Sequence, residues 1–263
     1  MATAKKALAA LLPLLERKED RGFLTEAQKG MEAWSELMRQ RASRLDKPMK
    51  PHVVAGEVGK RLRSDAIVSC DSGTITTWWS RHVPVKRGQK HSVSGTLATI
   101  ACGLPYTIAA QIAYPDRQCM GFVGDGGFSM LRAEFATCVK YKLPVKVVVV
   151  KNNTLGQEQV VFLGVPEYGV ELQPIDFAQF ARVCGGKGFT IEEPAQCGAI
   201  VEQALAKPGP VVIEALVDPF EPPLPAKITL DQAAKFAKSL IMGEPNREKI
   251  ALTVFGDKMR EMV

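Results

Sequence analysis

Two short segments combine residue types that could hold a metal ion and a diphosphate. Phe122–Met130 reads Phe-Val-Gly-Asp-Gly-Gly-Phe-Ser-Met, and Lys151–Gly156 reads Lys-Asn-Asn-Thr-Leu-Gly. A glycine turn after a strand lets backbone amides approach a phosphate closely, and the N-terminus of the helix that follows favours negative charge. A diphosphate is therefore the first ligand that these segments suggest.

Asp125 and Asn152 distinguish the pattern from a dinucleotide-binding loop. Inside the turn, the Asp125 carboxylate would repel a pyrophosphate unless a cation lay between them. Ser129 stands where the third glycine or alanine of G-x-G-x-x-G would fall, and the next strand ends in Asn152 rather than an acid. The two oxygen-bearing side chains, 27 positions apart (152 − 125), suit Mg²⁺ carrying a diphosphate. The alternative is a glycine turn followed by an unrelated asparagine pair, and the strand–helix–strand pattern between the segments argues against it.

Composition excludes several other functions. The chain has 263 residues, 46% of them hydrophobic and 24% charged, which allows one sizeable core with accessory segments. The net charge of +6 is scattered, without a Lys/Arg block, so we expect no nucleic-acid partner. The three histidines are isolated, and no apolar stretch is long enough to span a bilayer. The N-terminal apolar run ends at Pro13 and predicts a helix rather than a targeting segment.

The cysteines are widely spaced and lack a C-x-x-C pair, which is typical of buried, reduced thiols and predicts a cytoplasmic protein. These cysteines are Cys70, Cys102, Cys119, Cys138, Cys184 and Cys197. The tail Glu248–Val263 has an apolar face, so peripheral contact with the inner membrane stays open beside the more common packing helix.

Apolar strands alternate with amphipathic helices, which predicts an α/β fold with a doubly wound parallel sheet and helices on both faces. The expected strands are Ala66–Cys70, Gln118–Val123, Val145–Val150, Gly188–Ile191 and Pro210–Val217. The expected helices are residues 4–17, Thr25–Ser43 opened by a capping box, Val53–Leu62, a segment with Trp78, Cys102–Ile112, Leu131–Tyr141, one capped by Asp176, Ala195–Ala206 and Leu230–Met242. Between the sheet elements, Thr154–Gln173 has the length and composition of an active-site lid.

One further turn follows a strand, at Asp71–Thr74. Ligands of open α/β sheets bind at such strand ends, but Asp71 or Ser72 could equally cap the next helix. The local sequence leaves both possibilities open.

With these residues placed, the chain resembles the C-terminal, diphosphate-binding domain of thiamine diphosphate (ThDP) enzymes, in the pyruvate oxidase and pyruvate:quinone dehydrogenase branch. The resemblance covers about Leu8 to Met242. Besides the two opening segments, it rests on Asp71–Thr74, Leu97–Ile100, Lys142–Val145, Pro222-Pro223 and Ile228–Leu230.

The resemblance implies a role for each matching residue. Asp125 and Asn152 would ligate Mg²⁺ by side-chain oxygens, together with the Thr154 carbonyl. Ile100 would hold ThDP in its bent form, and the Ala98 carbonyl would accept a hydrogen bond from its 4′-amino group. The complete set of implied cofactor-binding residues is Gly73, Thr74, Ala98, Thr99, Ile100, Asp125, Gly126, Gly127, Asn152, Asn153, Thr154, Leu155 and Gly156.

The resemblance also predicts what this chain lacks. We expect residues 1–46 to be the helical tail of a middle domain plus a linker, 47–220 the diphosphate-binding domain, and 221–263 a helical extension. The family's catalytic Glu lies in an N-terminal, pyrimidine-binding domain with no copy here, and FAD would need the missing middle domain. We therefore expect no catalytic residue on this chain, which would be a fragment or a split subunit of a homo-oligomer.

The expected reaction is decarboxylation of a 2-oxo acid, with pyruvate as the first candidate and electrons passing to FAD and then to quinone or oxygen. Acetolactate synthase-type carboligation and a non-catalytic ThDP-binding or assembly module are the alternatives. Gln157 replaces an aromatic residue of many relatives, and Gly156–Val160 is shorter than theirs, which places the substrate contacts there in question.

Overall fold

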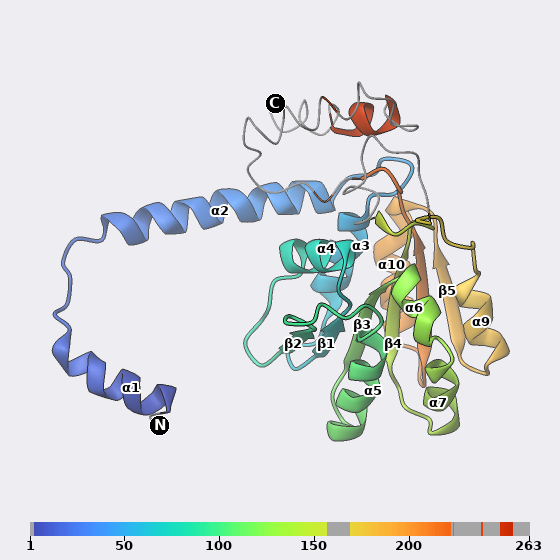
Figure 1. Cartoon of the computed structure of the whole chain (residues 1–263), viewed down its shortest axis with the longest axis horizontal. Helices are drawn as coiled ribbons and strands as arrows, with labels where there is room; N and C mark the ends of the chain where they lie inside the picture. Colours follow the sequence, from blue (N-terminus) through green and yellow to red (C-terminus); the bar gives the residue numbers. More distant parts are fainter. Residues whose placement is uncertain (1–2, 157–168, 222, 224–237, 239–247, 255–263) are drawn as a thin grey trace. The chain divides into compact units, whose positions relative to one another are not determined.

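The computed structural model describes residues 3–156, 169–221, 223, 238 and 248–254 (Figure 1). Contacts divide the chain into two units, Met1–Met38 and Arg39–Val263. Apart from Lys238, the predicted helix Leu230–Met242 lies outside the described residues, as does most of the predicted lid.

The first unit is helical. Helix α1 (Ala4–Leu11) and the 3-10 turn η1 (Leu12–Leu14) precede the long helix α2 (Gly22–Ala42), which continues into the second unit. The predicted capping box at Thr25 is wrong. Asp20 Oδ1 accepts a hydrogen bond from the Gly22 N–H at 2.8 Å, so α2 begins earlier and Thr25 lies within its first turn.

The second unit contains a six-stranded sheet of order β2-β1-β3-β4-β6-β5, in which every pair of neighbours is parallel. The strands are β1 (Ile67–Cys70), β2 (Lys90–Val93), β3 (Cys119–Gly124), β4 (Lys146–Lys151), β5 (Lys187–Ile191) and β6 (Val211–Leu216). This confirms the predicted doubly wound α/β fold.

Helices connect the strands and cover both faces of the sheet (Figure 1). They are α3 (Pro51–Arg61), α4 (Thr74–His82), α5 (Gly103–Ala113), α6 (Asp125–Leu131), α7 (Glu134–Lys140), α9 (Phe177–Val183) and α10 (Cys197–Leu205), with the 3-10 turn η2 (Pro194–Gln196) before α10. One core contains residues of α3, α4 and α10, and the other contains residues of α5, α6, α7 and α9.

The position of strand β4 in the sheet explains its run of four valines, Val147–Val150. Val148 and Val150 point into the first core, and Val147 and Val149 point into the second. A strand covered on both faces has no solvent side, so successive valines are all buried. Lys146 begins the strand and donates its buried amine to the carbonyls of Lys207 and Gly209, at 2.6 and 2.7 Å.

Two elements differ from the prediction. Strand β2 was not predicted, because it is a polar edge strand of the sheet with little buried surface. Helix α6 was not predicted either: the helix predicted over Leu131–Tyr141 corresponds to α7, whereas α6 precedes it and covers the glycine segment from Asp125. The glycine turn is therefore the first turn of a helix.

Candidate metal-diphosphate site

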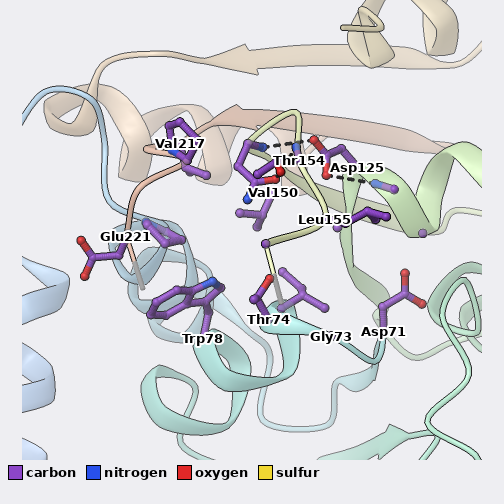
Figure 2. A pocket seen from close by; sticks show the side chains of 18 of the residues that line it. Asp71, Gly73, Thr74, Trp78, Asp125, Val150, Thr154, Leu155, Val217 and Glu221 are labelled. Atoms are coloured by element: carbon purple, nitrogen blue, oxygen red, sulfur yellow. Dashed lines mark hydrogen bonds between the residues drawn. The ribbon is translucent and has the colours of Figure 1, made fainter. Parts of the chain in front are cut away.

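A pocket lies where strands β1, β3 and β4 end (Figure 2). Because the strands are parallel, the residues that follow them meet at one edge of the sheet. The pocket is lined by Asp71–Ile75, Gly124–Gly127, Val150, Asn152, Thr154–Gly156, Val217–Glu221, Pro51, Trp78, Ile100 and Ile250. Residues far apart in the sequence thus surround one space.

Asp125 joins the ends of β3 and β4. Its Oδ1 accepts a hydrogen bond from the Gly126 N–H at 2.9 Å, and its Oδ2 accepts from the N–H groups of Asn152 and Asn153 at 3.1 and 2.6 Å. The side chain is 5% exposed. Burial raises the pKa of this carboxyl to about 6, although the backbone N–H groups favour the charged form.

The backbone of the Asn152-Asn153 segment is bent, which brings its N–H groups to the Asp125 carboxylate. Asn153 has a φ of 56°, in the left-handed region that asparagine tolerates better than most residues. This bend turns two successive N–H groups toward one carboxylate oxygen. The Asn152 side-chain oxygen accepts a hydrogen bond from the Thr154 N–H at 3.2 Å, and the Thr154 hydroxyl donates to the Val170 carbonyl, also at 3.2 Å.

Glycines keep the pocket open for a ligand. Gly73 precedes α4 with a φ of 122°, no side chain caps that helix, and its first residues line the pocket. A β-carbon on Gly126 would lie 3.0 Å from Leu155 Cδ2. A β-carbon on Gly127 would lie 2.0 Å from Asp71 Oδ2, closer than atoms can approach. Helix N-termini and bare backbone are a suitable surface for an anion.

The structure brings ten of the thirteen predicted cofactor-binding residues to the pocket wall. Ala98, Thr99 and Asn153 are not part of that wall. Ala98 and Thr99 belong to an exposed loop in which the Thr99 N–H donates to Ser94 Oγ at 3.1 Å, and Asn153 supplies its N–H to Asp125. Contact of these residues with a cofactor stays a prediction.

Neither Asp71 nor Ser72 caps α4, the helix that follows the turn, so that possibility is wrong. The N-cap of α4 is Gly73, with no side-chain hydrogen bond. Instead the Asp71 carboxylate, 1% exposed, accepts the Gly103 N–H at 2.6 Å through Oδ1. Burial raises the pKa of Asp71 to about 6.

Sequence reasoning missed the other end of the pocket. Lys50 Nζ lies 2.8 Å from Asp218 Oδ2 and 2.8 Å from Glu221 Oε2, and its side chain is buried. The two carboxylates outweigh the effect of burial and raise the pKa of Lys50. No sequence pattern links these residues, because Lys50 and Asp218 are 168 positions apart.

The donors present fit a hard cation with a diphosphate. Asp125 offers a carboxylate, Asn152 an amide oxygen and Thr154 a backbone carbonyl, which are the oxygen donors that Mg²⁺ prefers. Within the described residues, no group of three His, Cys, Asp or Glu could hold a metal. The described cysteines are all free, and no described helix has the length and hydropathy of a membrane span.

Comparisons with known proteins agree with this site. Residues 71–215 match the family of thiamine pyrophosphate enzymes, in their C-terminal TPP binding domain. A Bacillus subtilis protein, YdaP, described as thiamine pyrophosphate-containing, is 39% identical over 89% of this chain and 41% of its own length. Pyruvate oxidase of Lactiplantibacillus plantarum is 32% identical over 91% of this chain and 41% of its own.

Acetolactate synthases match less of the chain. The large subunit of isozyme 1 of Escherichia coli is 30% identical over 66% of this chain and 32% of its own length. The chain thus spans about two fifths of YdaP and of the pyruvate oxidase. The family match covers residues 71–215, which contain β2 to β5, all of β6 except Leu216, and the glycine segment with its asparagine pair; β1 ends just before that range. The chain belongs to the thiamine pyrophosphate enzymes and carries their C-terminal cofactor-binding domain.

Proposed function

We propose that the pocket holds the diphosphate end of ThDP through Mg²⁺, in an enzyme that decarboxylates a 2-oxo acid. The observation that carries this proposal is the placement of Asp125 between the N-terminus of α6 and the Asn152-Asn153 segment. ThDP, when bound, supplies a carbon nucleophile and an electron sink for the decarboxylation of 2-oxo acids.

In this proposal, one set of groups around Asp125 binds the metal ion and another set binds the diphosphate. The Asp125 carboxylate, the Asn152 side-chain oxygen and the Thr154 carbonyl would hold Mg²⁺. The backbone N–H groups at the starts of α4 and α6 would hold the diphosphate. Those groups belong to Gly73, Thr74, Gly126 and Gly127. Asn153, Leu155 and Gly156 complete that end of the pocket.

The loop before α5 would serve the other end of the cofactor. The Ala98 carbonyl would accept a hydrogen bond from the 4′-amino group, with Thr99 beside it. Ile100 would hold the cofactor in its bent form. Ala98 has a φ of 50°, which turns its peptide unit relative to an extended chain. Ile100 reaches the pocket wall. The residues of this chain thus orient the cofactor, while the Glu of an N-terminal domain would act on its pyrimidine ring.

Pyruvate is the proposed substrate, with FAD and then quinone or oxygen as acceptors in the complete protein. The extent of similarity favours an oxidase over a carboligase, because the pyruvate oxidase matches 91% of this chain and the Escherichia coli acetolactate synthase 66%. Assembly as a homo-oligomer with the Glu-bearing domain, and a cytoplasmic location consistent with free thiols, belong to the same proposal. Peripheral contact with the membrane remains open within it.

Calorimetry tests the binding proposal, and reconstitution tests the activity. ThDP should bind the chain with Mg²⁺ and lose affinity when EDTA removes the metal. Equal binding in EDTA would contradict the metal assignment. The chain alone should not decarboxylate pyruvate, and an added pyrimidine-binding domain should restore turnover. Binding without restored turnover on pyruvate would favour a non-catalytic ThDP-binding module, and acetolactate as the product would favour the carboligase.

A further inference from the structure

We infer that Asp71 is a positioning residue that fixes the loop Ser94–Cys102, so that the cofactor's ring end is held as firmly as its diphosphate. This inference rests on the proposed function of the pocket. It concerns a buried carboxylate to which neither the sequence motif nor the family resemblance gives a task.

The backbone of Asp71 is fixed on the sheet. Its N–H donates to the Phe122 carbonyl at 3.1 Å, and its own carbonyl accepts the Thr76 hydroxyl at 2.6 Å. The side chain lines the pocket on the opposite side from Glu221 in Figure 2. The carboxylate therefore projects from a rigid base.

One carboxylate oxygen holds the start of α5. Asp71 Oδ1 accepts the Gly103 N–H at 2.6 Å, from a residue 32 positions away. The residue before the helix, Cys102, makes no side-chain cap. Asp71 thus does for α5 what an N-cap side chain does locally, and its negative charge suits the helix N-terminus.

The loop that enters α5 needs such a restraint. Ala98 and Ala101 have φ values of 50° and 71°, a left-handed conformation that alanine rarely adopts. Hydrogen bonds fix the loop at both ends. At its start, Ser72 Oγ donates to the Ser94 carbonyl at 3.2 Å, and Ser94 Oγ accepts the Thr99 N–H. At its end, Cys102 Sγ donates to the Cys70 carbonyl at 3.6 Å, and Asp71 accepts the Gly103 N–H. Ala98 and Ile100 lie between the bonds at Ser94 and those at Cys102 and Gly103.

The second oxygen lies against the glycine segment. Asp71 Oδ2 is buried and accepts no hydrogen bond from any described residue. It lies 2.0 Å from the position of a β-carbon on Gly127, and the Ala101 nitrogen lies 3.3 Å from that same position. Asp71, Ala101 and Gly127 therefore converge on one point, where the ring-facing loop meets the diphosphate-facing turn.

This geometry separates two roles. If Asp71 positions the loop, replacing it should weaken contacts to the cofactor rings and spare those to the diphosphate. Replacement by Asn also removes a negative charge near an anion site, so inorganic pyrophosphate should bind equally or more tightly. If Asp71 only supported the core, its replacement would weaken the binding of ThDP and of pyrophosphate together.

The test compares two ligands in the 263-residue chain, Mg²⁺ with inorganic pyrophosphate and Mg²⁺ with ThDP, by calorimetry. Asp71→Asn is nearly isosteric, and whichever way the amide turns, its NH₂ faces either Gly103 N–H or the Ala101–Gly127 contact. We expect about 10-fold weaker ThDP binding or more, as for other residues that position a ligand shell, with unchanged or tighter pyrophosphate binding. Asp116→Asn, on an exposed turn, removes the same charge and should change neither.

Ser94→Ala keeps the inference testable if Asp71→Asn fails to fold. It removes only the bond to the Thr99 N–H and should give the same selective loss, smaller in size. Equal losses for both ligands, or none for ThDP, would overturn the positioning role. The positioning role would also be overturned if the wild-type chain bound ThDP no more tightly than inorganic pyrophosphate. If the wild-type chain binds neither ligand, the proposed function itself falls and takes this inference with it.

Discussion

The carboxylate of Asp71 occupies the space that a side chain at position 127 would need, with Asp71 Oδ2 2.0 Å from the position of a β-carbon on Gly127. Gly127 is thus required for a steric reason, apart from any contact with phosphate. The nearest fixed groups to that position are the Asp71 carboxyl and the Ala101 nitrogen.

Gly127→Ala should therefore destabilise the protein without any ligand. Overpacking of this kind typically costs about 1–3 kcal/mol of unfolding free energy. Denaturant unfolding of the ligand-free chain measures it. Gly124→Ala is the matched control, because nothing lies within 4 Å of a β-carbon there and its φ is −83°.

Adding Asp71→Ala to Gly127→Ala should recover part of the lost stability, because it empties the contested space. If the double variant is as unstable as the sum of the two single variants, the two residues do not compete for that space.

Asp125→Ala and Asn152→Ala should each abolish Mg²⁺-dependent binding of ThDP. Changes in groups that only support metal ligands already cost about 10- to 100-fold in affinity, so removal of a ligand should cost about 100-fold or more. Calorimetry with Mg²⁺ measures this, with Asp116→Asn as the control for charge. Wild-type affinity in either variant would remove that residue from the metal site.

The two buried acids, Asp71 and Asp125, should contribute to the pH dependence of the unfolding free energy. Burial raises the pKa values of Asp71 and Asp125 to about 6 from their ordinary 3.8. The folded state then holds protons more strongly than the unfolded state between these values, so unfolding free energy should rise as pH falls from about 7 toward 4. Each group contributes at most about 3 kcal/mol to this rise.

Thermal unfolding at pH 7 and pH 5 checks this in the ligand-free chain. Asp71→Asn cannot titrate, so its rise in stability should be smaller than that of the wild-type chain. The comparison cancels the contributions of all other acids. Parallel pH profiles for the two proteins would contradict a raised pKa at Asp71.

Lys50 should matter to stability far more than a surface lysine. Lys50→Met leaves Asp218 and Glu221 buried without their shared cation, and breaking a buried pair costs about 3–5 kcal/mol. Lys47→Met breaks an exposed contact with Glu193 and should cost about 1 kcal/mol or less. If denaturant unfolding shows that the two substitutions lower the unfolding free energy equally, the buried ion pair stabilises the protein no more than the exposed one.

Local sequence patterns predicted the doubly wound sheet and the proximity of Asp125 to the Asn152-Asn153 segment. The valine run of β4 predicts a strand buried on both faces, and the glycine and asparagine segments predict the meeting of Asp125 with Asn152. Both inferences depend on residues close in sequence or on the geometry that every parallel sheet shares.

The remaining features depend on tertiary contacts that no local pattern encodes. The polar edge strand β2 exists because β1 offers it a partner. Asp71 meets Gly103, and Lys50 meets Asp218, across 32 and 168 positions. Helix α6 was not predicted, because the glycines that look like a turn adopt helical geometry directly after β3.

Asp125 accepts backbone N–H groups from both sides before any cation arrives, two of them from the end of β4. The register that sets Gly124 opposite Val150 brings those groups to the carboxylate. The carboxylate of the proposed metal site is therefore positioned by strand pairing, and binding of a cation there should need little rearrangement of it. Binding of a cation at Asp125 should therefore be thermodynamically coupled to the pairing of β3 with β4, and amide hydrogen exchange in these strands would report on that coupling.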